Sequence, residues 1–101
     1  MTQGQIPDDT PTNLQEKILL EDAKNQPGIE IIGGTDTPLR DAPRLISNYG
    51  GNPEYWYKIA SNQTTIIDGA IVEIHWYRNN KTGQNVEYKI KRTYPRTARK
   101  N

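Results

Sequence analysis

The segment 70–91, AIVEIHWYRNNKTGQNVEYKIK, constrains the fold more than any other part of the chain. Apolar and polar residues alternate on both sides of Asn80-Lys81-Thr82-Gly83, as is typical of two half-buried antiparallel strands joined by a type I turn with a glycine bulge. Because side chains alternate between the two faces of a strand, one set must line the core. That set is Val72, Ile74, Trp76, Tyr88 and Ile90. If the pairing of the two strands shifted by one residue, lysines would be buried in the core. The face on which each side chain lies is therefore strongly fixed.

A glycine bulge at Gly83 predicts cross-strand partners whose numbers sum to about 164. On the outer face, this register sets Tyr77 opposite Glu87, His75 opposite Lys89, and Glu73 opposite Lys91. The face would then hold an imidazole, a phenol, carboxylates and ammonium groups within two strands.

Further strands are predicted at EYWYKIA (54–60) and TTII (64–67), and Asp68-Gly69 is a two-residue hairpin signal. Ile29, Ile31 and Ile32 form a short apolar segment that ends at Gly33-Gly34. Asp41 is placed to cap a second short helix, residues 42–48, which would end at Gly50-Gly51.

The first predicted helix has Thr12 as its cap, with Gln15 completing a capping box, and ends before Pro27-Gly28. Its buried face is predicted to contain Leu14, Ile18, Leu19 and Ala23, and its wet face Glu16, Glu21 and Asp22. The chain is therefore predicted to be an α+β domain, with one or two N-terminal helices packed on a three- to five-stranded antiparallel β-meander.

The length of 101 residues points to a single domain, which we expect to span residues 13–94. Residues 1–12 are predicted to be a disordered tail or linker, and residues 95–101 a basic C-terminal tail. The chain has no cysteine, which excludes disulfides, thiolate metal sites and a cysteine nucleophile. We predict no metal ligand set, no cofactor and no membrane span, and the N-terminus does not resemble a signal peptide.

The charge is unevenly distributed. Residues 1–41 carry eight acids and three bases, a net charge of −5, whereas residues 42–101 carry ten bases and four acids, a net charge of +6. A basic half suggests an anionic partner, but a solubilising basic surface explains the same composition equally well.

The predicted outer face of the hairpin suits the cleavage of RNA. That reaction needs a base for the 2′-hydroxyl, an acid for the leaving 5′-oxygen, and cations for the charge that grows on the phosphoryl oxygens. An imidazole can act as acid or base near neutral pH. The predicted catalytic residues are His75, Lys89, Glu73 and Tyr77, and the predicted substrate-binding residues are Lys58, Arg78, Lys91, Arg92 and Tyr57. Cross-strand Glu–Lys pairs are also a common way to solvate a sheet, so this face can equally be scaffold.

Three segments carry a family resemblance. LQEKILLEDAKNQPG (14–28), DAPRLISNYGGNPEYWYKIAS (41–61) and VEIHWYRNNKTGQNVEYKIK (72–91) resemble parts of the C-terminal toxin modules of bacterial polymorphic toxins. Such modules end large RHS-repeat and filamentous-haemagglutinin-like (contact-dependent inhibition) proteins. Trp76 stands where these modules have Tyr, and Tyr88-Lys89 where they have Phe-Lys.

The resemblance implies an effector that is secreted or delivered from the cell surface, acts in the cytoplasm of a competing bacterium, and is neutralised by a cognate immunity protein. Many such modules are metal-independent RNases of the barnase-, EndoU-, colicin- and RelE-like group, which suggests cleavage of tRNA or another structured RNA. Two alternatives stay open. One is a non-catalytic module that binds nucleic acid or protein through its basic C-terminal half. The other is a toxin of different chemistry, such as a metal-dependent DNase. The oligomeric state cannot be predicted.

Overall fold

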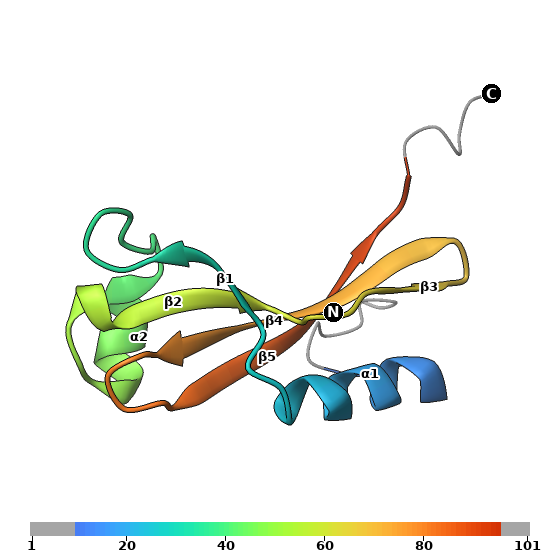
Figure 1. Cartoon of the computed structure of the whole chain (residues 1–101), viewed down its shortest axis with the longest axis horizontal. Helices are drawn as coiled ribbons and strands as arrows, with labels where there is room; N and C mark the ends of the chain where they lie inside the picture. Colours follow the sequence, from blue (N-terminus) through green and yellow to red (C-terminus); the bar gives the residue numbers. More distant parts are fainter. Residues whose placement is uncertain (1–9, 96–101) are drawn as a thin grey trace, which may run out of the picture.

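The computed structural model describes residues 10–95 and shows an α+β fold, with two helices and a five-stranded antiparallel sheet (Figure 1). This confirms the predicted fold class. The elements are α1 (Leu14–Lys24), β1 (Ile29–Gly33), α2 (Ala42–Tyr49), a 3-10 turn η1 (Pro53–Tyr55), β2 (Trp56–Ala60), β3 (Thr65–Ile67), β4 (Ala70–Asn79) and β5 (Asn85–Thr93). The predicted tails fall largely in residues 1–9 and 96–101, outside the described residues.

Strand β4 is the centre of the sheet. It pairs with β5 along one edge and with β2 and β3, one after the other, along its other edge, while β1 lies outside β2. Both predicted turns form. Asp68 and Gly69 adopt positive φ values of 51° and 82°, as a two-residue hairpin turn requires. The N–H of Gly83, which has φ +84°, donates to the carbonyl of Asn79 at 2.7 Å.

The predicted facing of the hairpin is confirmed, and its register is confirmed in part. His75 pairs with Lys89, and Glu73 with Lys91. Tyr77, however, pairs with Val86 and not with Glu87, because the register shifts between His75 and Tyr77. Glu87 lies in this irregularity with φ +60°, a left-handed conformation that is uncommon outside glycine.

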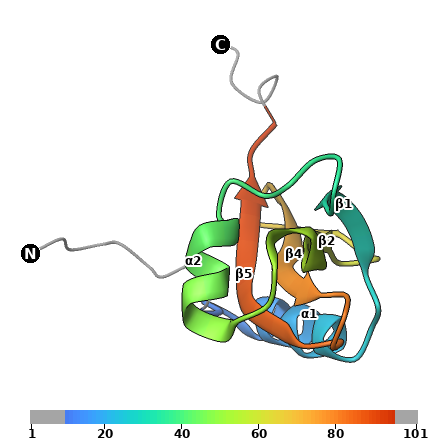
Figure 2. The ribbon, with the colours of Figure 1, turned by 90° about the vertical axis from the view of Figure 1, so that its left-hand side faces the viewer.

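One face of the sheet packs on α1, and we call it the α1 face. Figure 2 shows α1 and α2 on different sides of the sheet. The core of the α1 face is formed by Leu19, Leu20, Ala23, Ile59, Ile67, Ala70, Val72, Ile74, Trp76 and Ile90. Both strands of the predicted hairpin thus supply apolar side chains to this core, as their alternation requires.

The start and the buried face of α1 differ from the prediction. The cap is Asn13, whose side chain accepts from the N–H of Glu16 at 2.8 Å, and Thr12 instead donates to the Glu16 carboxylate. Glu16 is buried, although we expected it to face water, whereas Leu14 and Ile18 are exposed. The physical reason is a partner on β5, Arg92, which a helical periodicity cannot reveal.

The opposite face, which we call the α2 face, is covered by α2 at one end only. Its core there contains Leu39, Ala42, Leu45, Trp56 and Tyr77. Helix α2 begins after Asp41 as predicted, but the Asp41 side chain makes no capping hydrogen bond and accepts one from Tyr77 instead. Tyr77 is therefore buried under α2, whereas the sequence placed it on a wet surface.

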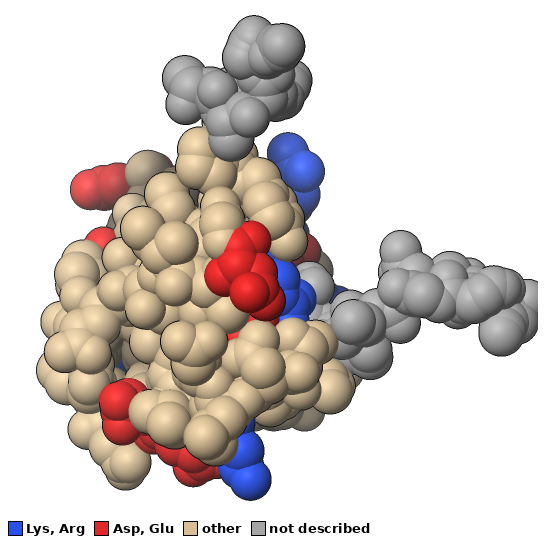
Figure 3. Space-filling view, turned by 90° about the vertical axis from the view of Figure 1, so that its right-hand side faces the viewer, with Lys and Arg blue, Asp and Glu red and all other residues tan. Residues whose placement is uncertain are grey.

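The far end of the sheet, where the β3–β4 turn lies, is mostly uncharged. Figure 3 shows a few separate acidic and basic side chains on this end, mixed in sign. A nucleic-acid surface needs a concentration of positive charge, which this view does not show. Neither helix of the described residues is long and apolar enough to cross a membrane.

Candidate functional site

The predicted site residues separate into two groups because adjacent residues of a strand point to opposite faces. Lys58 pairs with Tyr77, His75 with Lys89, and Glu73 with Lys91, so these six share the α2 face. The other three predicted residues, Tyr57, Arg78 and Arg92, belong to the α1 face. The candidate site therefore lies on the α2 face, beside the end that α2 covers.

The centre of the site is a contact between Glu73 and His75. The two residues are two positions apart on β4, and Glu73 Oε2 lies 2.9 Å from His75 Nε2. The histidine side chain is 13% exposed and the glutamate 33% exposed, so the pair is partly shielded from water. The other ring nitrogen, Nδ1, is buried and has no hydrogen-bond partner among the described residues. A buried polar atom without a partner is costly and is often explained by a function.

Three lysines surround this pair. Lys58 comes from β2, and Lys89 and Lys91 from β5. They line a cavity of about 140 Å³ together with His75, Trp76, Tyr77, Glu87 and Ile90. In the described part of the chain, none of the three ammonium groups has a carboxylate within 4.0 Å. Their charge is therefore available to an anion that enters the cavity.

Tyr77 is held in a structural contact. Its hydroxyl donates to Asp41 Oδ2 at 2.6 Å, and burial, with help from that carboxylate, raises the pKa of Tyr77 to about 12. The same hydrogen bond lowers the pKa of Asp41. The phenol proton points at Asp41 and is hard to remove, so Tyr77 is badly placed to protonate a leaving group.

Glu87, whose carboxylate side chain lines this cavity, is tied to α2. Arg44 Nη1 lies 2.6 Å from Glu87 Oε2, and the Tyr49 hydroxyl donates to the same oxygen at 3.1 Å. The bond to Arg44 lowers the pKa of Glu87. Arg44 also lies 3.6 Å from Asp41, so one guanidinium faces the carboxylates of both Asp41 and Glu87. Sequence reasoning missed this cluster because 43 residues separate Arg44 from Glu87 and no local pattern links them.

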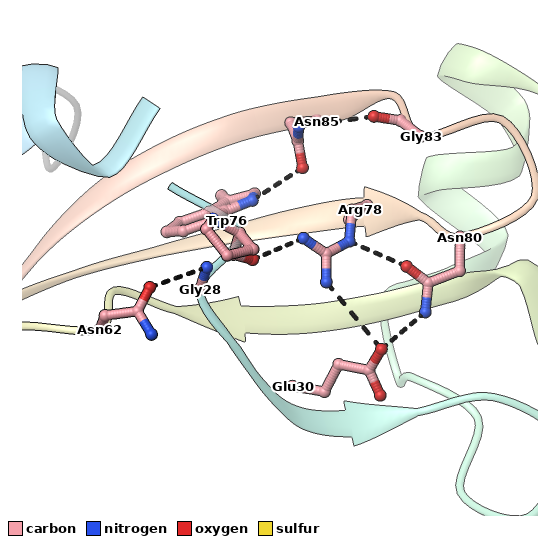
Figure 4. A network of polar contacts seen from close by, with 9 residues as sticks. Gly28, Glu30, Asn62, Trp76, Arg78, Asn80, Gly83 and Asn85 are labelled. Atoms are coloured by element: carbon pink, nitrogen blue, oxygen red, sulfur yellow. Dashed lines mark hydrogen bonds and ion pairs between the residues drawn. The ribbon is translucent and has the colours of Figure 1, made fainter. Parts of the chain in front are cut away.

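Arg78 was predicted to bind substrate, but its side chain is engaged elsewhere (Figure 4). Its Nε donates to Asn80 Oδ1 at 2.8 Å, its Nη1 donates to the carbonyl of Pro27 at 2.6 Å, and its Nη2 lies 3.9 Å from Glu30. Tyr57 packs against the core of the α1 face. Neither side chain lines the cavity around His75.

Arg92 is likewise committed. Its Nε and Nη2 each donate to one oxygen of Glu16 at 2.8 Å, in a bidentate pair between β5 and α1. This contact, above all, lowers the pKa of Glu16 to about 2. Arg92 therefore fastens the helix to the sheet, on the face opposite to His75.

The arrangement can move a proton next to a bound anion. His75 has a carboxylate on one nitrogen and an unpartnered nitrogen on the other, and three lysines lie around the same cavity. Orientation of an imidazole by a carboxylate is a recurrent device for general acid–base catalysis. Within residues 10–95, no three side chains of the types that ligate metals cluster closely enough to hold an ion.

Comparison with known proteins adds no relative. No family model matches the chain, no curated protein matches its sequence, and no solved structure matches its fold. The resemblance to the toxin modules of bacterial polymorphic toxins therefore stays a prediction that rests on the motifs quoted above.

Proposed function

We propose that this protein is a metal-independent endoribonuclease that cleaves RNA by attack of the 2′-hydroxyl on the adjacent phosphate. The observation that carries the proposal is the Glu73–His75 pair at a cavity lined by Lys58, Lys89 and Lys91. A proton acceptor and several cations around one small space are what this reaction needs.

His75 is the general base in this proposal. When Nε2–H donates to the Glu73 carboxylate, the lone pair of the imidazole lies on Nδ1, the nitrogen without a partner. Because Nδ1 is shielded from solvent, the ring must turn about its Cβ–Cγ bond to meet a 2′-hydroxyl in the cavity. This turn takes Nε2 away from Glu73 Oε2, so the Glu73 carboxylate stabilises the imidazolium that forms through its nearby charge.

The bond changes are those of transesterification. The 2′-oxygen bonds to phosphorus as its proton passes to His75, and the bond from phosphorus to the 5′-oxygen breaks. Lys58, Lys89 and Lys91 stabilise the negative charge on the phosphoryl oxygens. Lys89, directly across from His75, supplies the proton that the leaving 5′-oxygen takes up. The products are a 2′,3′-cyclic phosphate and a 5′-hydroxyl.

The biological setting of the proposal comes from the family resemblance. We propose that the protein is a toxin delivered into competing bacteria, that its substrate is tRNA or another structured RNA, and that a cognate immunity protein inhibits it. Binding of that protein over the α2 face would block access to His75 and the three lysines.

The test is incubation of the purified protein with total bacterial RNA, with and without chelator. His75→Ala is expected to lose at least about 100-fold in cleavage rate, the lower end of what a general base contributes. Glu73→Gln is expected to lose less, because the imidazole remains. Lys17→Gln, an exposed position on α1, is the matched surface control and should cleave like the wild type.

Each result discriminates between readings. Cleavage that survives chelator and disappears in His75→Ala supports the proposal. If a folded His75→Ala variant cleaves RNA at the wild-type rate, His75 has no catalytic role and is a structural residue of the sheet. Cleavage lost in chelator points to metal-dependent chemistry. If the folded wild type cleaves neither RNA nor DNA, the proposed endoribonuclease is ruled out, and the non-catalytic binding module becomes the function to test.

A further inference from the structure

A second cavity adjoins the one at His75. It has a volume of about 400 Å³ and is lined by Ile32, Pro38, Leu39, Arg40, Asp41, Lys58 and Tyr77. Lys58 and Tyr77 line both cavities, so the two are neighbours across these side chains. The new wall comes from β1 and from the loop after it, which passes over the end of the sheet that α2 covers (Figure 1).

The charge along the two cavities favours an anion with several negative groups. Arg40, Lys58, Lys89 and Lys91 have no carboxylate within 4.0 Å in the described part of the chain. The carboxylates beside them are already engaged. Tyr77 and Arg44 face Asp41, Arg44 and Tyr49 contact Glu87, and His75 contacts Glu73. Five cations, the four above and Arg44, therefore stand beside the three carboxylates Asp41, Glu73 and Glu87, and this excess of two positive charges favours an anion.

The spacing fits consecutive phosphates. Lys58 pairs with Tyr77, two residues along β4 from His75. Two residues of a strand span about 7 Å, close to the length of one nucleotide unit in an extended single strand. Lys58 lines both cavities, so it would bridge the phosphate at His75 and a second phosphate beside Arg40, about one nucleotide away. Ile32 and Pro38, both exposed and apolar, offer a surface for the attached sugar or base.

We infer that Arg40 and Lys58 form a second phosphate subsite, so that the protein binds an extended single-stranded polynucleotide with at least two consecutive phosphates. The subsite deepens the proposed RNase function, because it specifies that the substrate is held unpaired between His75 and the Arg40–Lys58 subsite. A positively charged groove that follows the backbone is how proteins hold single strands without reading their sequence.

The experiment measures equilibrium binding of a fluorescent single-stranded oligodeoxyadenylate at several salt concentrations. The probe has no 2′-hydroxyl and cannot be cleaved by the proposed chemistry. For single strands, the slope of log K against log salt changes by about 0.7 for each phosphate contact. Arg40→Gln should therefore reduce the slope by about 0.7, and Lys58→Gln by a similar amount. Lys17→Gln, which removes the same charge from α1, should leave it unchanged.

Arg40 is exposed and makes no ion pair in residues 10–95, so Arg40→Gln should fold normally, which circular dichroism will check. Equal slopes for wild type and Arg40→Gln, or no binding of the probe at all, would overturn the subsite. The outcome is separate from the fate of the RNase proposal. If the Arg40→Gln slope is reduced but the wild type does not cleave RNA, the subsite is supported and the RNase proposal is contradicted. If the wild type cleaves RNA but the slope is unchanged, the RNase proposal is supported and the subsite is contradicted.

Discussion

At the scale of single residues, Tyr77 shows how a position can be chemically suitable and still be structural. A phenol beside an imidazole is a reasonable proton donor. Here the hydroxyl donates to Asp41 under α2, and its pKa of about 12 keeps it protonated through the physiological range. Its contribution therefore belongs to the attachment of α2 to the sheet.

Tyr77→Phe tests this assignment. The variant keeps the buried ring and removes one hydrogen bond to a charged acceptor, so the free energy of unfolding should fall by about 1–3 kcal/mol in a urea titration. Tyr94→Phe, at an exposed ring, should change it little. The rate of RNA cleavage by the folded variant should fall by much less than the roughly 100-fold expected when a general acid is removed. A loss of that size with an intact fold would make Tyr77 catalytic.

The residues that sequence reasoning placed correctly are those fixed by local alternation. Side chains alternate between the two faces of a strand, and the apolar residues of this hairpin must face the core. Their polar neighbours therefore share the other face, and these are Glu73, His75, Lys89 and Lys91. The features that the sequence did not predict have non-local causes. A bulge at Glu87 changed the partner of Tyr77, and α2 covered a surface that the hairpin alone leaves open. Arg78 and Arg92 found partners 48 to 76 residues away — distances over which a single sequence gives no signal.

At the scale of elements, the bidentate pair of Glu16 and Arg92 joins α1 to β5. The Glu16 side chain is only 3% exposed, and its carboxylate also accepts from the N–H and hydroxyl of Thr12. Removing one partner of such a buried pair leaves an uncompensated charge, which is strongly destabilising. The pair therefore matters for the position of the helix more than for binding.

The pair predicts acid sensitivity with a definite sign. The pKa of Glu16 falls from an ordinary 4.5 to about 2 in the folded state, so the unfolded state takes up the proton more readily. The stabilisation is fully present above pH 4.5 and is lost as the pH falls toward 2, with a magnitude on the order of 3 kcal/mol. Urea titrations from pH 6 to pH 3 should show the larger part of this loss in the wild type and in Glu21→Gln, a control that removes an exposed carboxylate from the same helix.

Glu16→Gln should be less stable at pH 6 and lose less stability on acidification, because its amide does not titrate. The carboxyls of Asp41 and Glu87, whose pKa values are also lowered, leave a residual dependence in every variant. Equal losses in Glu16→Gln and in the wild type would contradict the assignment.

The connection between α1 and β1 depends on Gly28. Its φ is +71°, and an added Cβ would collide with the side chains of Ile59 and Trp76. Gly83 has a similar φ of +84° with open space around it, which makes it a matched control. Both Gly→Ala changes should cost about 1–2 kcal/mol for the left-handed backbone. Gly28→Ala should cost clearly more in thermal or urea unfolding, because a core side chain must also move. Equal costs would show that the collision is relieved.

At the scale of the whole molecule, the two faces of one sheet each line a separate hydrophobic core. Trp76 lies in the core of the α1 face and Trp56 in the smaller core under α2. Strand β4 contributes to both, through the adjacent residues Trp76 and Tyr77. Since the two cores share a strand, we expect them to unfold together. The alternation in β4 made the first core predictable, whereas the second needed the position of α2, which no local pattern gives.

The two tryptophans allow this to be measured. With excitation selective for tryptophan, the fluorescence of Trp56→Phe reports on the core of the α1 face, and that of Trp76→Phe on the core under α2. Within each variant, the urea transition seen by fluorescence should coincide with that seen by far-ultraviolet circular dichroism, as two-state unfolding requires. An earlier fluorescence transition in Trp76→Phe would mean that α2 detaches before the rest of the domain unfolds.

The solitary imidazole has a practical consequence. A chain with one histidine gives one imidazole spin system in a nuclear magnetic resonance spectrum, so its signals need no assignment among several. Nε2 contacts Glu73, whereas Nδ1 is buried without a hydrogen-bond partner in residues 10–95, so the two nitrogen resonances report on different surroundings. The tautomer of the ring and the arrival of any molecule in the cavity can therefore be followed directly, on the unmodified protein and before any activity is known.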